Sequence, residues 1–127
     1  MQRAFLIAFL LIAAFGWAGW SLRAASSGRA LGHPPRTAVP TTVAAVRRNP
    51  HAFAGKTISL TGRMTECCPT AGCWFYLNDG TGDLRVDARE GGFSVVGLPV
   101  GSRLRVFGTI THEPGEDPQL AAVGARS

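Results

Sequence analysis

Phe75-Tyr76-Leu77-Asn78-Asp79-Gly80-Thr81-Gly82 is the stretch that decides the fold. An aromatic and apolar run ends in Asn-Asp-Gly, and Asp-Gly supplies the positive φ that a tight hairpin turn needs. The next residues, 83–87, alternate polar and apolar side chains as a half-buried strand does. We therefore predict two antiparallel strands, over residues 73–78 and 83–87, joined by a tight turn.

The same alternation predicts a strand before this hairpin. Over residues 57–64 one face carries Ile58, Leu60 and Met64. The other face carries Thr57, Ser59, Thr61 and Arg63. Gly62 interrupts the apolar face, which indicates a bend or a close approach of another backbone.

Further elements are expected on both sides of these strands. Residues 41–48 read as a short helical turn that Thr41 or Thr42 caps and Asn49-Pro50 ends. A longer connection, residues 90–101, precedes a strand over 102–110 with Leu104, Val106 and Ile110 inward. A last strand is expected over residues 119–123.

Five short strands with a longer connection between the third and fourth describe an all-β, five-stranded Greek-key barrel of the OB-fold type. Two sequence motifs resemble those of OB domains: residues 55–62 resemble the motif of the first strand, and residues 75–82 resemble the "DGTG" hairpin. The tRNA-anticodon type of nucleic-acid-binding domain shares this hairpin. The resemblance implies the fold and leaves the function open.

An apolar segment precedes the barrel. Residues 4–22 carry no charge between Arg3 and Arg23, and this run of about 19 residues is long enough for a transmembrane helix. We expect an uncleaved anchor; a cleaved signal peptide is the alternative, with Ala24-Ala25-Ser26 as a serviceable site. Both place the rest of the chain outside the cytoplasm, either at the bacterial inner membrane facing the periplasm or secreted.

Composition divides the chain into three parts. Residues 1–22 form the anchor or signal, residues 23–40 form a flexible tether rich in small residues, glycine and proline, and residues 41–127 form one small domain. Four of the thirteen basic residues precede the domain, which leaves nine against all eight acids and a domain charge of +1. A nucleic-acid binder should carry its basic patch on the folded domain, and by count this domain does not.

Three cysteines lie between the first two strands. Cys68 and Cys73 enclose a tight loop, and thiols outside the cytoplasm meet oxidising conditions, so we expect a Cys68–Cys73 disulfide that pins this loop. Soft-metal binding is the alternative: Cys67, Cys68 and Cys73, with His51 or His112, would supply sulfur and nitrogen ligands to copper or zinc. Attack of the third thiol on the disulfide is a further alternative.

A narrower resemblance concerns the cysteines. The sequence resembles a family of exported bacterial domains of unknown function that carry C-x-x-x-G-C-W between the first two strands, a "DG" hairpin and a "GF" segment. The matching residues are Cys68, Gly72, Cys73, Trp74, Asp79, Gly80, Gly92 and Phe93. Cys67 departs from that pattern. The anchored haem chaperone of cytochrome c maturation is similar in architecture, but its histidine-to-tyrosine signature is absent around His112.

A candidate binding face combines aromatic and basic side chains. Trp74 and Tyr76 share one face of their strand. Four arginines are predicted to point away from the core: Arg63, Arg85, Arg103 and Arg105. Exposed aromatic residues beside arginines would suit single-stranded nucleic acid, although export and the near-neutral domain charge disfavour that partner.

We therefore predict a membrane-tethered extracytoplasmic OB-fold module that binds an envelope protein or a small ligand. The alternatives are a copper, other metal or haem handling module in envelope assembly, and a nucleic-acid-binding domain. No nucleophile–base pair, phosphate loop or carboxylate dyad can be argued from the sequence, so we expect no enzyme.

Overall fold

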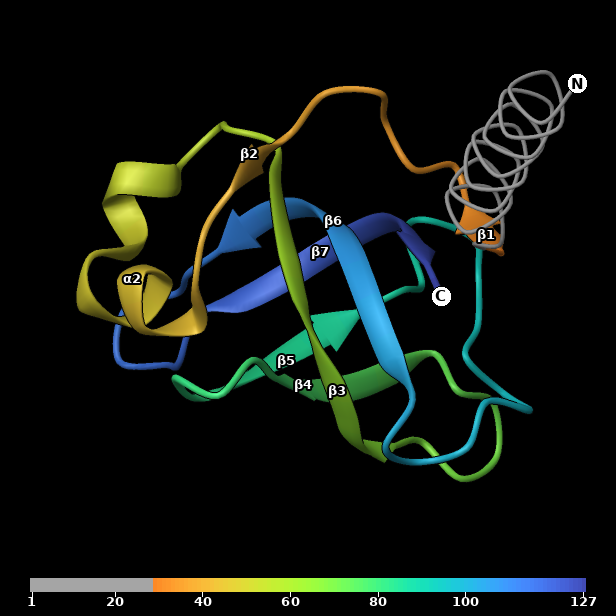
Figure 1. The fold of residues 1–127 in the computed structure, drawn as a ribbon. Helices are drawn as coiled ribbons and strands as arrows, with labels where there is room; N and C mark the ends of the chain where they lie inside the picture. Colours follow the sequence, from red (N-terminus) through yellow and green to blue (C-terminus); the bar gives the residue numbers. More distant parts are fainter. Residues whose placement is uncertain (1–28) are drawn as a thin grey trace, which may run out of the picture.

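The computed structural model describes residues 29–127 as one barrel with a helical cap (Figure 1). Seven strands follow in chain order: β1 (Ala30–Gly32), β2 (Val39–Pro40), β3 (Ile58–Cys67), β4 (Trp74–Asn78), β5 (Asp83–Asp87), β6 (Arg103–Thr111) and β7 (Gln119–Arg126). Helix α2 (Val43–Arg48) and a 3₁₀ helix (Pro50–Phe53) lie between β2 and β3. The predicted helical turn and the five predicted strands are all present, and the last strand is longer than expected.

Five of these strands close into a barrel. β3, β4 and β5 form an antiparallel meander, β5 pairs in parallel with β7, and β6 pairs antiparallel with both β7 and β3. The circuit β3–β4–β5–β7–β6 returns to its first strand, as in an OB-type barrel. The predicted all-β, five-stranded OB-fold-like barrel is confirmed.

The long strand β3 joins the two halves of the barrel. Residues 58–63 pair with β6, and residues 63–67 pair with β4. Gly62 lies at the changeover, where a Cβ atom would stand 2.4 Å from the carbonyl oxygen of Asn78. The predicted close backbone approach is therefore present, and it requires glycine.

Alternating apolar side chains fill the barrel. The largest buried ones are Phe75, Ile58, Leu60, Met64, Leu77, Leu84, Leu104, Leu120, Val43, Val46, Val86 and Val95. The inward residues predicted for the first and fourth barrel strands are buried, except that Ile110 is half-buried. Ser59, predicted to face outward to solvent, is 2% exposed, because β2 pairs alongside it.

The segment expected to be a flexible tether, residues 23–40, is attached to the barrel over its second part. β1 pairs with the end of β7, β2 pairs with the start of β3, and His33 N donates to Val123 O at 3.0 Å. These backbone hydrogen bonds connect residues far apart in sequence, so local composition did not reveal them. The boundary predicted at residue 41 is thus corrected: the folded part includes residues 30–40.

The expected anchor, residues 4–22, lies outside the described residues. Within residues 29–127, no helix is long and apolar enough to cross a membrane.

The hairpin between β4 and β5 holds helix α2 against one end of the barrel. Asp79 Oδ2 accepts a hydrogen bond from Val43 N at 2.9 Å, and Thr81 Oγ1 accepts one from Ala44 N at 3.0 Å. Thr42 caps the same helix by accepting from Ala45 N at 3.2 Å. The first amide groups of a helix have no partner within it, so the DGTG turn supplies partners for them.

Asp79 acts as a carboxylate in this contact. Burial raises the pKa of Asp79, but the hydrogen bonds from the Thr81 hydroxyl, Val43 N–H and Thr81 N–H outweigh burial and hold the pKa below its usual range. Hydrogen bonds to a charged acceptor are stronger than those to a neutral one. The charged form of Asp79 therefore stabilises the fold.

Asp79→Ala should lower the free energy of unfolding by about 1 kcal/mol, the usual effect of losing a helix cap. Because the folded pKa is depressed, the stabilisation is complete above the unfolded pKa of about 3.9 and is lost as the pH falls through the folded pKa. Urea unfolding curves of variant and wild type should differ at neutral pH and converge in strong acid. Glu113→Ala, in an exposed loop, is the control and should leave stability unchanged at both pH values.

Candidate functional site

The six residues predicted for one binding face separate into two groups. Trp74, Tyr76 and Arg85 lie together on β4 and β5, and we call them the aromatic strip. The other three, Arg63, Arg103 and Arg105, lie on β3 and β6. The order of neighbouring strands around the barrel is β5, β4, β3 and β6, so the two groups of residues lie on different sides of the barrel.

The aromatic strip is a preformed cluster on the outside of the barrel. The Trp74 and Tyr76 rings meet edge to face, with centroids 6.2 Å apart. The Arg85 guanidinium lies 4.9 Å from the centroid of the Trp74 ring, within range of a cation–π interaction. Arg85 Nε is buried and has no hydrogen-bond partner among the described residues. The strip thus combines fixed apolar rings with an arginine whose hydrogen-bonding capacity is not used up.

The loop beside the strip, residues 67–73, is ordered by backbone hydrogen bonds, and we call it the cysteine loop. Cys68 N donates to Trp74 O at 3.0 Å, and Gly72 N donates to Cys68 O at 3.1 Å. Gly72 has a φ of +59°, and a Cβ atom there would stand 2.5 Å from Val96 N. Glycine is therefore required at this turn.

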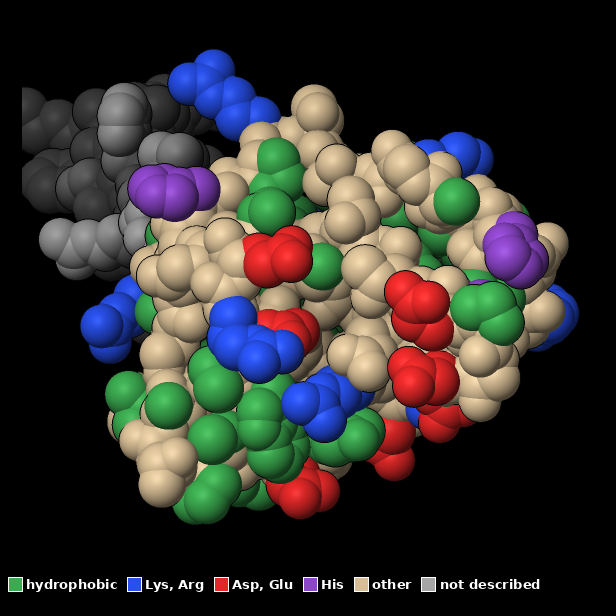
Figure 2. Space-filling view, turned by 180° about the vertical axis from the view of Figure 1, so that it is seen from behind, with side chains coloured by type: hydrophobic (Ala, Val, Ile, Leu, Met, Phe, Trp, Pro, Cys, Tyr) green, Lys and Arg blue, Asp and Glu red, His purple; other side chains and the backbone are tan. Residues whose placement is uncertain are grey.

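The cysteine loop packs on the connection between β5 and β6. Val95 N donates to Gly72 O at 3.0 Å, and Ser94 Oγ donates to Ala71 O. Val96 and Val100 in this connection are 64% and 62% exposed. Figure 2 shows hydrophobic side chains gathered at the end of the barrel where these two segments lie. The strip therefore borders an apolar surface.

The cysteines are half-buried and unpaired in the structure, so the Cys68–Cys73 disulfide stays a prediction. Cys68 Sγ lies 3.5 Å from Thr70 Oγ1. Hydrogen bonding from the Thr70 side chain, followed by the backbone amides of Ala71 and Thr70, lowers the pKa of Cys68 to about 6. A thiol with such a pKa is largely thiolate at neutral pH, which is the reactive form.

The structure does not bring together the predicted metal ligands Cys67, Cys68, Cys73 and His112. Strand β6 runs antiparallel to β3, so His112 follows the end of β6 that lies by Ile58, whereas Cys67 ends β3 at the opposite side. His112 instead meets His51, with ring centroids 5.5 Å apart. Among residues 29–127, no three His, Cys, Asp or Glu side chains gather in a way that could hold a metal ion. Chain spacing gave the ligand types but not their positions in the barrel.

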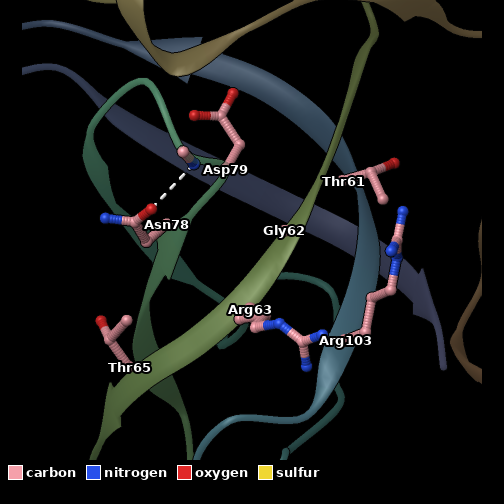
Figure 3. Close-up of a pocket in the computed structure, with 8 residues that line it drawn as sticks. Thr61, Gly62, Arg63, Thr65, Asn78, Asp79 and Arg103 are labelled. Carbon is pink, nitrogen blue, oxygen red and sulfur yellow. Dashed lines mark hydrogen bonds between the residues drawn. The ribbon is translucent and has the colours of Figure 1, made fainter.

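A shallow hollow of about 400 Å³ lies over Gly62 (Figure 3). Its lining residues are Thr61, Gly62, Arg63, Thr65, Asn78, Asp79, Gly80 and Arg103. Arg63 Nη1 donates to Gly101 O at 3.1 Å, and Asn78 Oδ1 accepts from Gly80 N at 2.8 Å. Asp79 contributes a negative charge at one end of the hollow, but both of its carboxylate oxygens already accept hydrogen bonds, from Val43 N and from Thr81. The two arginines therefore provide most of the hydrogen-bond donors that remain free in the hollow.

Two further arginines, which were not among the residues predicted for the binding face, belong to this basic region. Arg36 and Arg126 line a hollow of about 500 Å³ together with Arg105. Alternation along β7 gave no signal for Arg126, because the register shifts at Val123, so that Ala122 and Ala125 are both buried and Arg126 is exposed. Arg36 had no local signal, because its position depends on the pairing of β1 and β2 with distant strands.

The solved structure of the hypothetical protein ygiW from E. coli is similar to this chain at 16% sequence identity, with a TM-score of 0.49. The similarity covers 70% of this chain and 88% of that chain. No protein-family model and no curated protein matches the chain. The fold assignment therefore rests on strand order and pairing, and the resemblance to exported domains with the C-x-x-x-G-C-W motif stays a prediction.

In the reduced protein, Cys68 should react with iodoacetamide at a rate that rises with pH around a midpoint of about 6. Thr70→Val removes the main stabilising hydrogen bond, so the midpoint should move upward. Mass spectrometry of peptides from timed, quenched reactions gives the rate at each cysteine separately. Cys67 is the internal control, since its rate should not respond to Thr70→Val. An unchanged Cys68 profile in the variant would contradict this account.

Proposed function

We propose that the protein is a membrane-tethered extracytoplasmic binding module whose ligand is another protein of the cell envelope. The observation that carries the proposal is the clustering of Trp74, Tyr76 and Arg85 on the second and third strands of the barrel. Trp, Tyr and Arg are the residue types that dominate protein–protein hot spots. The face formed by these two strands is the one that OB-type barrels use for binding.

The surroundings of the strip favour a protein over a small ligand. The strip lies outside the barrel, because the residues alternating with it, Phe75 and Leu77, are fully buried. The apolar rim that includes Val96 and Val100 extends the same surface over the cysteine loop. A broad outer surface with aromatic anchors resembles an interface more than a pocket enclosing a small molecule.

Within this proposal, the cysteine loop has a supporting role. A disulfide between Cys68 and Cys73 would hold residues 68–73 in the conformation that positions Trp74, with the β5–β6 connection packed against the loop. Preorganising a binding loop lowers the ordering cost of association.

The disulfide can be tested on protein purified from the envelope without reductant. We expect an intact mass two hydrogens below that of the fully reduced chain, and the same difference in Cys67→Ser. Cys73→Ser should abolish the difference. Three free thiols in wild-type protein would show that the loop is held by its hydrogen bonds alone.

The partner can be tested by photo-crosslinking in cells. A benzoylphenylalanine residue at position 76 should yield a discrete protein adduct, and Arg85→Ala in the same chain should reduce its yield about tenfold, the effect of losing roughly 1.4 kcal/mol at a hot spot. The same probe at position 56 is the matched control, because Lys56 is exposed in the turn before β3, away from the strip. Equal adduct yields at both positions, or a yield that Arg85→Ala leaves unchanged, would refute the proposed interface.

A further inference from the structure

Five exposed arginines form a continuous basic surface on the barrel, which we call the arginine face. Its members are Arg36, Arg63, Arg103, Arg105 and Arg126. Strand pairing places Arg63 directly opposite Arg103, and Arg105 directly opposite Arg126. Arg36 reaches the same surface from the segment between β1 and β2.

No ion pair within the described part of the chain neutralises this face. The two salt bridges there, Arg47–Asp117 and Arg89–Asp87, involve arginines elsewhere. Most acids of the domain lie on β5, in the segment that follows it and in the loop before β7, and Figure 2 shows acidic side chains on the side of the barrel seen from behind. The two acids nearest the arginine face are Glu66, near the far end of β3, and Asp79, whose carboxylate accepts hydrogen bonds from Val43 N and Thr81. The net charge is only +1 for residues 41–127, or +2 when Arg36 is included, but the charges are unevenly distributed over the domain.

Two of the five arginines are partly fixed in place. Arg105 lies 5.2 Å from the centroid of the Phe107 ring, and Arg63 donates to Gly101 O. The contact with Phe107 uses the flat face of the Arg105 guanidinium, and the hydrogen bond to Gly101 uses one nitrogen of Arg63. Among residues 29–127, the remaining N–H donors of both side chains are free. Guanidinium groups suit phosphate oxygens, which accept from two donors at once.

The arginine face lies beside the point where the chain enters the barrel. In the pairing of β1 with β7, Ala30 stands opposite Arg126. Residues 23–29 are all that separates β1 from the apolar segment, and a chain of that length spans about 25 Å at most. If residues 4–22 enter the bilayer, the face is held close to the lipid head groups.

We propose that the arginine face docks on the anionic phospholipid head groups of the membrane to which the chain is tethered. This inference rests on the proposed tether. Charge complementarity favours an anionic surface as the ligand of the arginine face. The short segment of residues 23–29 favours the surface of the membrane to which the chain is tethered. Single-stranded nucleic acid fits less well, because the aromatic residues that would stack bases lie on β4 and β5 and not among these arginines.

Docking would also orient the domain. Strand β6, at the centre of the arginine face, pairs with β3 and β7 and with neither β4 nor β5, so the aromatic strip would point toward the periplasm when the arginine face meets the lipid. The membrane surface and the protein partner would then occupy different sides of the same barrel.

The test uses the full chain in nanodiscs of phosphatidylcholine alone or with added phosphatidylglycerol, each with a trace of gadolinium-chelating lipid. Nuclear magnetic resonance should show amide relaxation enhancement at Arg105 and Arg126 that is roughly threefold larger in the anionic discs. About 1 M salt shortens the screening length to about 3 Å and should remove the difference. The double variant Arg105→Glu, Arg126→Glu should also remove it, and Arg36→Gln, Arg103→Gln should reduce it in a milder background.

Arg48→Glu with Lys56→Glu is the matched control, since both side chains are exposed away from the face and the difference should persist. Equal enhancement in both disc types would overturn the proposal, as would loss of the difference in the control. A third outcome would also overturn the proposal. If the two disc types give equal enhancement, and a single-stranded oligonucleotide binds wild type but not the Arg105→Glu, Arg126→Glu variant, the ligand of the arginine face is nucleic acid and not lipid.

Alkaline carbonate extraction tests the tether separately. If the chain is released, the tether is wrong, and sedimentation of the released full chain with phosphatidylglycerol vesicles then tests the face directly. Sedimentation that the Arg105→Glu, Arg126→Glu variant abolishes would support the face, and its absence in wild type would overturn it.

Discussion

The pairing of β7 with three other strands is the constraint on which the rest of the structure depends. Its parallel contact with β5 and its antiparallel contact with β6 close the barrel, and its end also bonds to β1. Leu120, Ala122 and Ala125 on this strand are buried in the core. At Gly124 a Cβ atom would stand 2.4 Å from Pro34 N, so glycine lets the incoming segment cross the strand. Barrel closure and chain entry are thus fixed by one element.

The sequence predicted those features that depend on neighbours along the chain. Asp79-Gly80 identified the hairpin, and the alternation around Ile58 and Leu104 gave the correct buried faces of β3 and β6. Ser59 shows where this reasoning stops: alternation places it outside the barrel, but β2 then covers that position. The attachment of residues 30–40 could not be predicted either, since β1 pairs with β7 at the other end of the domain and β2 pairs with β3 beyond the intervening helices.

The sequence indicated which residues are exposed at the candidate sites but not which of them lie close together. Alternation correctly placed Trp74 beside Tyr76 and turned the arginines outward. Alternation gave no information about where each strand lies around the barrel. Arg85 was therefore grouped with Arg63, although the two residues lie on different surfaces of the barrel. The same gap explains the metal hypothesis, in which His112 was combined with cysteines that lie at the opposite end of β3. The sequence therefore indicates which types of side chain are available for a site, whereas the closure of the barrel determines which of these side chains lie close together.

The placement of like charges offers an argument about selection that the fold alone does not provide. Two pairs of directly opposed arginines, Arg63 with Arg103 and Arg105 with Arg126, cost the isolated barrel stability, on the order of 0.2–1 kcal/mol per pair. A single acid at any of these four positions would relieve the repulsion, and the domain has eight acids placed elsewhere. An anionic surface relieves all of these repulsions together. The polarised distribution therefore does not maximise the stability of the barrel alone, and the proposed docking on an anionic surface would account for it.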